Sequence, residues 1–227
     1  LTVQGKRQQA RLAFEKGLEM APGHLALTNN LARLALSVGD RSGAIRVLKT
    51  ALAIHPNSVE TMMRLSRVHE RGNDEDAALL WMQKARSVDL KRIDVSIALV
   101  ELFLRRADTS GAQEVTRELT TAHPDDLAVL AVSGRVDLAA GEPFKAKASF
   151  ERMSRLAGYD TSTLLGVARL QRRANDLEGE RWSLEKAHAG DGRNQQALEA
   201  LVDNAIIREH QLHAREALTK LQALAPD

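Results

Sequence analysis

The sequence contains no cysteine among its 227 residues, which excludes disulfides, thiolate catalysis, zinc–thiolate sites and cysteine lipidation within them. Aromatic residues are also scarce, with 2 Trp, 1 Tyr and 4 Phe, which is few for one large globular core. Neither sign of charge dominates, because the chain has 32 basic and 30 acidic side chains. A net charge of +2 is too small to indicate a nucleic-acid-binding surface. The longest apolar run, Ser96 to Leu104, contains Glu101 and falls well short of the ~20 residues that span a bilayer. We therefore expect no nucleic-acid partner and no direct membrane insertion by this chain.

Proline is rare as well, but its positions are ordered. Four of the 5 prolines lie at multiples of 34 residues from one another: Pro22, Pro56, Pro124 and Pro226. A second column with the same step is mostly alanine: Ala10, Ala44, Ala78, Ala112, Ala146, Glu180 and Ala214. A period that holds without insertion or deletion over the whole chain indicates a repeat architecture.

Within one period the pattern predicts two helices joined by a short turn. In residues 59–92, Ser58 is a suitable N-cap, and apolar residues then recur at helical spacing. Gly72 and Asn73 tolerate the left-handed conformation that ends a helix, and Asp74 then caps a second helix. Neither helix can bury its apolar face alone, so each repeat must stack on its neighbours.

This unit resembles the tetratricopeptide repeat (TPR). Six residues match the large, small and proline stations of that family's pattern in order: Leu31, Ala32, Ala44, Leu48, Ala51 and Pro56. The resemblance implies an all-α fold, a right-handed α-solenoid of 34-residue helix-turn-helix repeats. It implies a single array over residues 1–227, with a partial repeat at 1–24, full repeats at 25–58, 59–92, 93–126, 127–160 and 161–194, and a last repeat at 195–227. Because neither end carries a polar capping helix, we expect the array to be a portion of a longer one.

Two segments carry a second resemblance. In their general run of residue types, and not in any diagnostic motif, Leu34 to Leu48 and Leu177 to Ala189 resemble the TPR lipoproteins of bacterial exopolysaccharide and PEP-CTERM protein-sorting systems. This resemblance implies a non-catalytic scaffold that mediates protein–protein interaction in the bacterial cell envelope or periplasm. Two alternatives stay open: a cytoplasmic array, and the regulatory or substrate-docking portion of a larger enzyme.

Three polar residues stand at stations where the family has a small or a large apolar residue. They are Asp137, Gln171 and Glu180. Because an unpaired carboxylate between two close helices is costly, we expect these side chains to lean out to solvent. The alternative is a hinge or a partner-facing patch in residues 127–194.

The sequence offers no catalytic constellation. It has no Walker loop, no GxSxG and no GxGxxG after a strand. His210 and His213 lie at i and i+3, but no third ligand stands at helical spacing nearby, and structural zinc usually has four. We therefore expect no enzyme activity, no cofactor and no metal. Trp182 lies on the outer side of its repeat and is a candidate exposed anchor.

By resemblance to the family, the first helix of each repeat lines a concave groove. Every base at the groove stations is arginine: Arg33, Arg64, Arg67, Arg71, Arg105, Arg135, Arg169, Arg172 and Arg173. The planar guanidinium suits carboxylate, phosphate or sulfate, which predicts a groove for an acidic protein or peptide segment, or for a charged polysaccharide. The competing interpretation is that these arginines pair with acids across neighbouring helices.

Within this set, the groove stations of residues 127–194 contain no acid. We therefore expect a positive trough made of four guanidiniums without local partners: Arg135, Arg169, Arg172 and Arg173. Val132, Leu138 and Leu165 are expected to form its apolar floor.

Overall fold

The computed structural model describes residues 3–224, and every regular element in them is an α-helix. These thirteen helices divide into two compact units, the first ending at Arg106 and the second beginning at Ala107. Unit 1 contains α1 (Val3–Met20), α2 (Leu25–Ser37), α3 (Arg41–Ile54), α4 (Val59–Glu70), α5 (Glu75–Val88) and α6 (Ile93–Arg105). Unit 2 contains α7 (Thr109–Ala122), α8 (Leu127–Ala139), α9 (Pro143–Leu156), α10 (Thr161–Arg173), α11 (Leu177–Gly190), α12 (Gln195–Ile207) and α13 (Gln211–Leu224).

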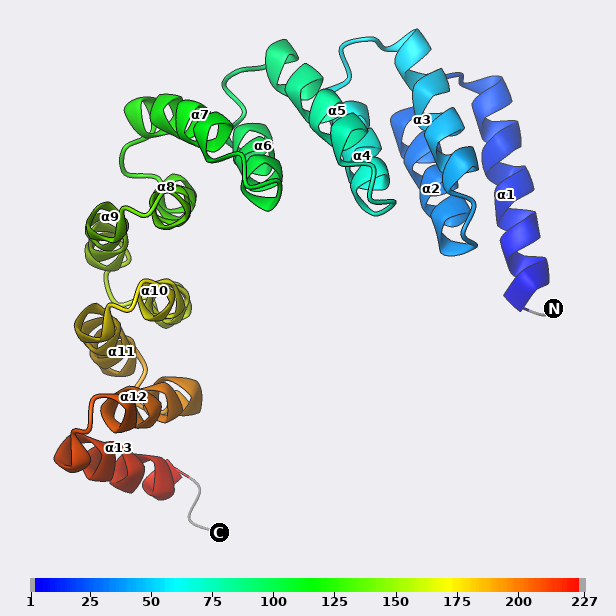
Figure 1. Ribbon diagram of the computed structural model, residues 1–227. Helices are drawn as coiled ribbons and strands as arrows, with labels where there is room; N and C mark the ends of the chain where they lie inside the picture. Colours follow the sequence, from blue (N-terminus) through cyan, green and yellow to red (C-terminus); the bar gives the residue numbers. More distant parts are fainter. Residues whose placement is uncertain (1–2, 225–227) are drawn as a thin grey trace. The chain divides into compact units, whose positions relative to one another are not determined.

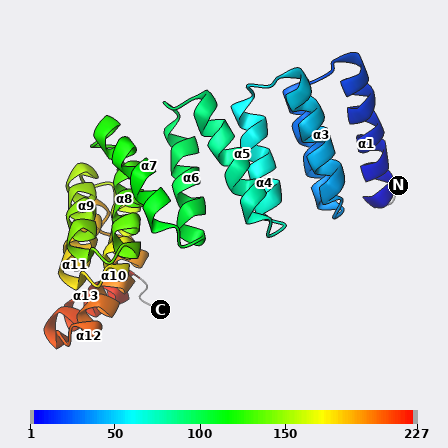
Figure 2. The same cartoon turned by 45° about the horizontal axis from the view of Figure 1, so that its top comes forward.

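Consecutive helices pack as antiparallel pairs within each unit. In unit 1, α4 and α5 lie side by side in both views (Figure 1, Figure 2), and in unit 2 the same pairing joins α8 to α9, α10 to α11 and α12 to α13 (Figure 1). This packing confirms the predicted fold class, an all-α solenoid of helix-turn-helix repeats. That the repeats form one array over residues 1–227 stays a prediction, and its ends, with Pro226, lie outside the described residues.

The caps predicted for residues 59–92 are confirmed. The Ser58 hydroxyl accepts a hydrogen bond from the Thr61 amide at 3.4 Å, which begins α4. After α4, Asn73 adopts a left-handed φ of 57°, and Asp74 then accepts from the Ala77 amide at 3.3 Å to begin α5. These side chains satisfy amides that the first turn of each helix leaves free.

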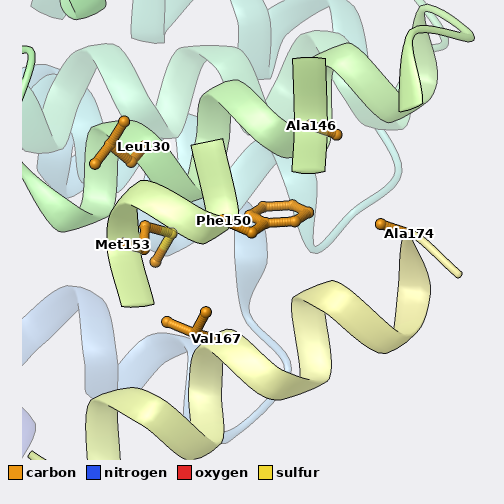
Figure 3. Packing of buried hydrophobic residues seen from close by; sticks show 6 residues of the cluster. All are labelled: Leu130, Ala146, Phe150, Met153, Val167 and Ala174. Carbon is orange, nitrogen blue, oxygen red and sulfur yellow. The ribbon is translucent and has the colours of Figure 1, made fainter. Parts of the chain in front are cut away.

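The alanine column lies on the packed side of the second helices in most repeats. Four of its members are fully buried, Ala44, Ala78, Ala112 and Ala146, whereas Ala214 is 8% exposed and Ala10 is half-buried. In unit 2, Ala146 shares a core cluster with Phe150, Leu130 and Val167, which Figure 3 shows converging from α8, α9 and α10. Small residues in the column leave room for large side chains such as the Phe150 ring, which is also fully buried.

Glu180 is the one carboxylate in the alanine column, and the expectation that it leans out to solvent is wrong. Its side chain does not lean out to solvent, because only 3% of the residue is exposed. Arg172 on α10 donates through Nε to both carboxylate oxygens at 2.6 and 2.7 Å, and Asn204 on α12 donates through Nδ2 at 2.9 Å. The carboxylate is therefore buried as a paired group, held from two neighbouring helices.

The expectation for Gln171 is wrong for the same reason. Gln171 is 1% exposed, and its Oε1 accepts a hydrogen bond from the Ser183 hydroxyl at 2.7 Å. The hydroxyl oxygens of Ser183 and Ser154 lie 2.7 Å apart, which extends the polar contacts from α10 through α11 to α9.

Asp137, the third polar residue at such a station, is half-buried. Its burial, followed by the nearby charge of Glu142, raises the pKa of its carboxyl group.

Candidate functional site

Four of the predicted groove arginines line one recess in unit 1. Arg64, Arg67 and Arg71 lie at i, i+3 and i+7 of α4 and its C-terminal end, so they share one face. On the facing helix α2, Asn29 and Arg33 lie at i and i+4 of a second stripe. The recess between these stripes has a volume of about 200 Å³, and its apolar lining is formed by Ala32, Leu36, Leu48 and Val68.

The arginines of this recess are only partly neutralised. Arg64 donates to the Glu60 carboxylate at 3.0 Å, and Arg33 donates to the amide oxygen of Asn30 at 3.1 Å. The side chains of Arg67 and Arg71 are exposed and make no hydrogen bond or ion pair with any residue in the described part of the chain. Four guanidiniums therefore stand beside one carboxylate.

Two polar atoms at the recess are buried without a protein partner in residues 3–224. One is the Nε donor of Arg64, and the other is the Oδ1 acceptor of Asn29. Buried polar groups are normally hydrogen-bonded, so both atoms have bonding capacity that the fold does not use.

The end of α4 is held firmly, which fixes where Arg67 and Arg71 emerge. Arg41 on α3 donates to the carbonyl oxygens of Gly72 at 3.1 Å and His69 at 3.3 Å. The His69 ring bonds to Asp74 at 2.8 Å. That hydrogen bond, followed by the one from the Ala77 amide, holds the pKa of the Asp74 carboxyl group below its ordinary value.

Arg105, also predicted for the groove, is engaged differently. It extends from α6 and pairs with Glu70 on α4, while Arg106 beside it bonds to Asp76 at 2.7 Å. The arginines at the end of α6 are thus paired with acids of α4 and α5, whereas most of the arginines between α2 and α4 are not, within the described residues.

In unit 2 the predicted four-arginine trough needs correction. Arg172 is not free, because it holds the buried Glu180. Arg135 is half-buried and takes part in an interaction of its own. Arg169 and Arg173 on α10 are exposed, and in the described residues their side chains bond to no protein group. The trough therefore offers two free guanidiniums.

The predicted floor of this trough is also wrong in part. Val132 is 2% exposed and Leu165 is 7% exposed, because both belong to the core of unit 2. Leu138 is only partly buried and packs against the Phe150 cluster. Buried residues can make no contact with a ligand, so Val132 and Leu165 drop out of the candidate site.

Other candidates from the sequence lie apart from these arginines. The rings of His210 and His213 are 5.5 Å apart, and no group of three His, Asp or Glu in residues 3–224 is placed to hold a metal ion. Trp182 is 43% exposed, with the Lys186 ammonium 4.8 Å from its ring centroid. Within the same residues no helix combines the length and apolarity needed to cross a membrane.

A second, larger recess was not predicted from the sequence. It lies in unit 1 among α1, α2 and α3, has a volume of about 610 Å³, and is lined by apolar residues that include Leu34, Val38 and Val47. Arg11 at its rim is paired with Glu15 at 2.8 Å. Its lining combines one face from each of three helices, and helical spacing alone does not reveal that these faces meet.

Comparisons with known proteins support the fold. No family model and no curated protein matches the chain. Among solved structures, the C-terminal part of a TPR repeat-containing protein from Cytophaga hutchinsonii is 17% identical, with a TM-score of 0.67 over 98% of this chain and 92% of that one. PilF from Pseudomonas aeruginosa is 23% identical, with a TM-score of 0.58 over 97% and 94% of the two chains. YrrB, described as a TPR protein with an unusual peptide-binding site, is 16% identical, with a TM-score of 0.53 over 83% and 97%. The chain therefore has the fold of TPR proteins.

Proposed function

We propose that this protein is a non-catalytic interaction scaffold that binds an acidic protein segment through the arginines of its first helices. The observation that carries this proposal is the recess between α2 and α4, where Arg67 and Arg71 are exposed beside Arg33 and Arg64 and have no partner among residues 3–224. Exposed guanidiniums on a rigid helical face can each form charge-assisted hydrogen bonds to a carboxylate. Arg169 and Arg173 supply a smaller surface of the same kind in unit 2.

The apolar lining of the recess supports a segment rather than a free ion as the partner. Leu36 is the half-buried apolar residue of this lining, and Ala32, Leu48 and Val68 are buried beneath it, so a bound chain meets hydrocarbon at Leu36 beside the guanidiniums. YrrB has the same fold and is described by its peptide-binding site, which agrees with a protein partner. A charged polysaccharide would bind through the arginines alone, and the apolar lining would then have no role.

The setting of the scaffold is proposed from the sequence. The texture of residues 34–48 and 177–189 favours a bacterial envelope system for polysaccharide export or protein sorting. We place the scaffold in the cell envelope on that ground. Fractionation of the native organism, with detection of this chain by antibody, tests the location directly, and recovery from the cytoplasm alone contradicts it.

A fluorescent peptide rich in Asp and Glu tests the binding function. Fluorescence anisotropy should show binding that weakens as salt is added, because the contacts are exposed charges. Arg67→Gln and Arg71→Gln should each lose about 1 kcal/mol of binding free energy, roughly fivefold in Kd. Arg46→Gln is the matched control, since Arg46 is exposed on α3 and lies outside the recess. Equal losses in all three variants would indicate a diffuse field and contradict a defined site.

A further inference from the structure

The charge of the α2–α4 recess exceeds what a carboxylate can balance. The recess has four positive charges, on Arg33, Arg64, Arg67 and Arg71. Glu60 neutralises one of them through its ion pair with Arg64. A side-chain carboxylate adds one more negative charge and two acceptor oxygens. A bound Asp or Glu would therefore leave two guanidiniums close together without an anion between them.

The guanidiniums reach the recess from two helices. Arg33 extends from α2, whereas Arg67 and Arg71 extend from α4 and its C-terminal end. Arg64 adds a buried Nε donor that has no partner among the described residues. Donors that converge from two sides suit an anion with oxygens on several sides, because each fork can meet a different oxygen.

The size and lining of the recess point the same way. Its volume of about 200 Å³ admits a compact anionic group with the first atoms of the side chain that carries it. Leu48 is fully buried, and Ala32 and Val68 are each 4% exposed, so the base of the recess is hydrocarbon. Hydrogen bonds to an anion are stronger over such a base than in open solvent.

We infer that this recess binds a phosphoryl group carried on the acidic segment, so that a phosphorylated serine or threonine anchors the partner in unit 1. The inference rests on the proposed function. A phosphate monoester carries a charge of about −1.5 to −2 at neutral pH and three acceptor oxygens, which answers the excess of positive charge and the two-sided donors. Arginine forks bind phosphate in a bidentate manner that lysine does not reproduce.

One unstructured peptide in four forms tests the inference. Its central residue is serine, phosphoserine, one glutamate or two adjacent glutamates, and the last form matches the charge of the phosphoserine. Isothermal titration calorimetry with the full chain should give tighter binding for the phosphoserine form than for the double glutamate, by about tenfold, the value of one charge-assisted hydrogen bond. Inorganic phosphate serves as a competitor, and it should displace the peptide only at far higher concentration if the segment contributes.

Variants place the preference in the recess. Arg67→Gln and Arg71→Gln should each abolish most of the preference for phosphoserine, and Arg33→Gln should reduce it. Arg46→Gln on α3 makes the same charge change in the same unit and should preserve it. All four side chains are exposed, so circular dichroism should show an unchanged fold.

The outcomes separate this inference from the proposed function. Equal binding of the phosphoserine and double-glutamate forms overturns the phosphoryl assignment and leaves the acidic-segment scaffold intact. A preference that survives in the Arg67 and Arg71 variants places the phosphate elsewhere and also overturns the inference. If inorganic phosphate binds as tightly as the phosphopeptide, the ligand is the free ion and not a protein segment. Failure of every peptide form and of the acidic peptide contradicts both proposals.

Discussion

Gly134→Ala tests whether the core of unit 2 is packed as tightly as the structure indicates. Gly134 is buried in α8, and a Cβ added there would lie 2.3 Å from Cε1 and 2.6 Å from Cζ of Phe150. The ring has little room to move, because it is fully buried and lies in a cluster with Leu130, Met153 and Val167 (Figure 3). The methyl group must therefore displace a helix or force the ring from its position.

The expected magnitude is the sum of two opposed effects. Overpacking a filled core costs about 1–3 kcal/mol. Replacing glycine by alanine inside a helix returns about 0.8–1 kcal/mol. The net change at Gly134 is thus a destabilisation of roughly 0–2 kcal/mol, with a central value near 1.

Gly166→Ala is the matched control for this experiment. Gly166 lies in α10 of the same unit, and beyond its own helix backbone no described residue would lie within 4 Å of its new Cβ. The control should therefore gain the full helix term of about 0.8–1 kcal/mol. Because both variants report on unit 2, the difference between them isolates the steric cost.

Urea unfolding followed by circular dichroism measures both variants, and Phe150→Leu provides a third point. Shrinking the ring should recover part of the loss in the Gly134→Ala background, as a double-mutant cycle with a favourable coupling. If Gly134→Ala raises the free energy of unfolding as much as Gly166→Ala does, then the space beside Phe150 is open and the packing argument fails.

Two further changes probe the polar core of the same unit. Arg172→Ala strands the buried carboxylate of Glu180 with only Asn204 as a donor, and should cost about 3–5 kcal/mol in urea unfolding. Glu180→Gln should cost less, because the Arg172 side chain is 34% exposed and can turn to water; the reverse order would contradict this account. The pKa of Asp137 is raised, by burial first and by Glu142 second, so the native state binds more protons above the ordinary value of 3.8 and stability falls as pH rises through the raised pKa. Asp137→Asn should therefore be more stable than the parent at neutral pH, with the gain vanishing near pH 3; a gain that persists in acid would refute the assignment.

The sequence predicted the features that depend on spacing. The 34-residue period, the turn at Asn73 and the cap at Asp74 are local, since each depends on a few consecutive residues and the conformations they tolerate. The fold class follows from these features, because helices with one apolar face have to stack.

The features that sequence reasoning missed depend on which side chains meet. Glu180 was expected in solvent, since its station alone does not reveal that Arg172 and Asn204 reach it from two other helices. The groove arginines look equivalent in the sequence, yet Arg105 pairs with Glu70, whereas Arg67 pairs with no acid in the described part of the chain. Charge pairing between repeats depends on the rotation of each helix, which periodicity leaves undetermined.

The polar contacts inside unit 2 have a consequence for how a repeat protein keeps its order. Repeats of similar shape present nearly interchangeable apolar surfaces, so hydrocarbon packing alone would accept a neighbour shifted by one repeat or supplied by another molecule. Two of the contacts cross from one repeat to the next: Ser183 meets Ser154 in the preceding repeat, and Glu180 meets Asn204 in the following one. A shifted or foreign neighbour would remove the contacts made by Ser154 and Asn204, at a cost of about 1–3 kcal/mol for each buried polar group left without its partner. These buried polar contacts thus specify which repeats pack against each other. We expect the repeats of unit 2 to pair in their own order during folding and to resist domain swapping with a second copy.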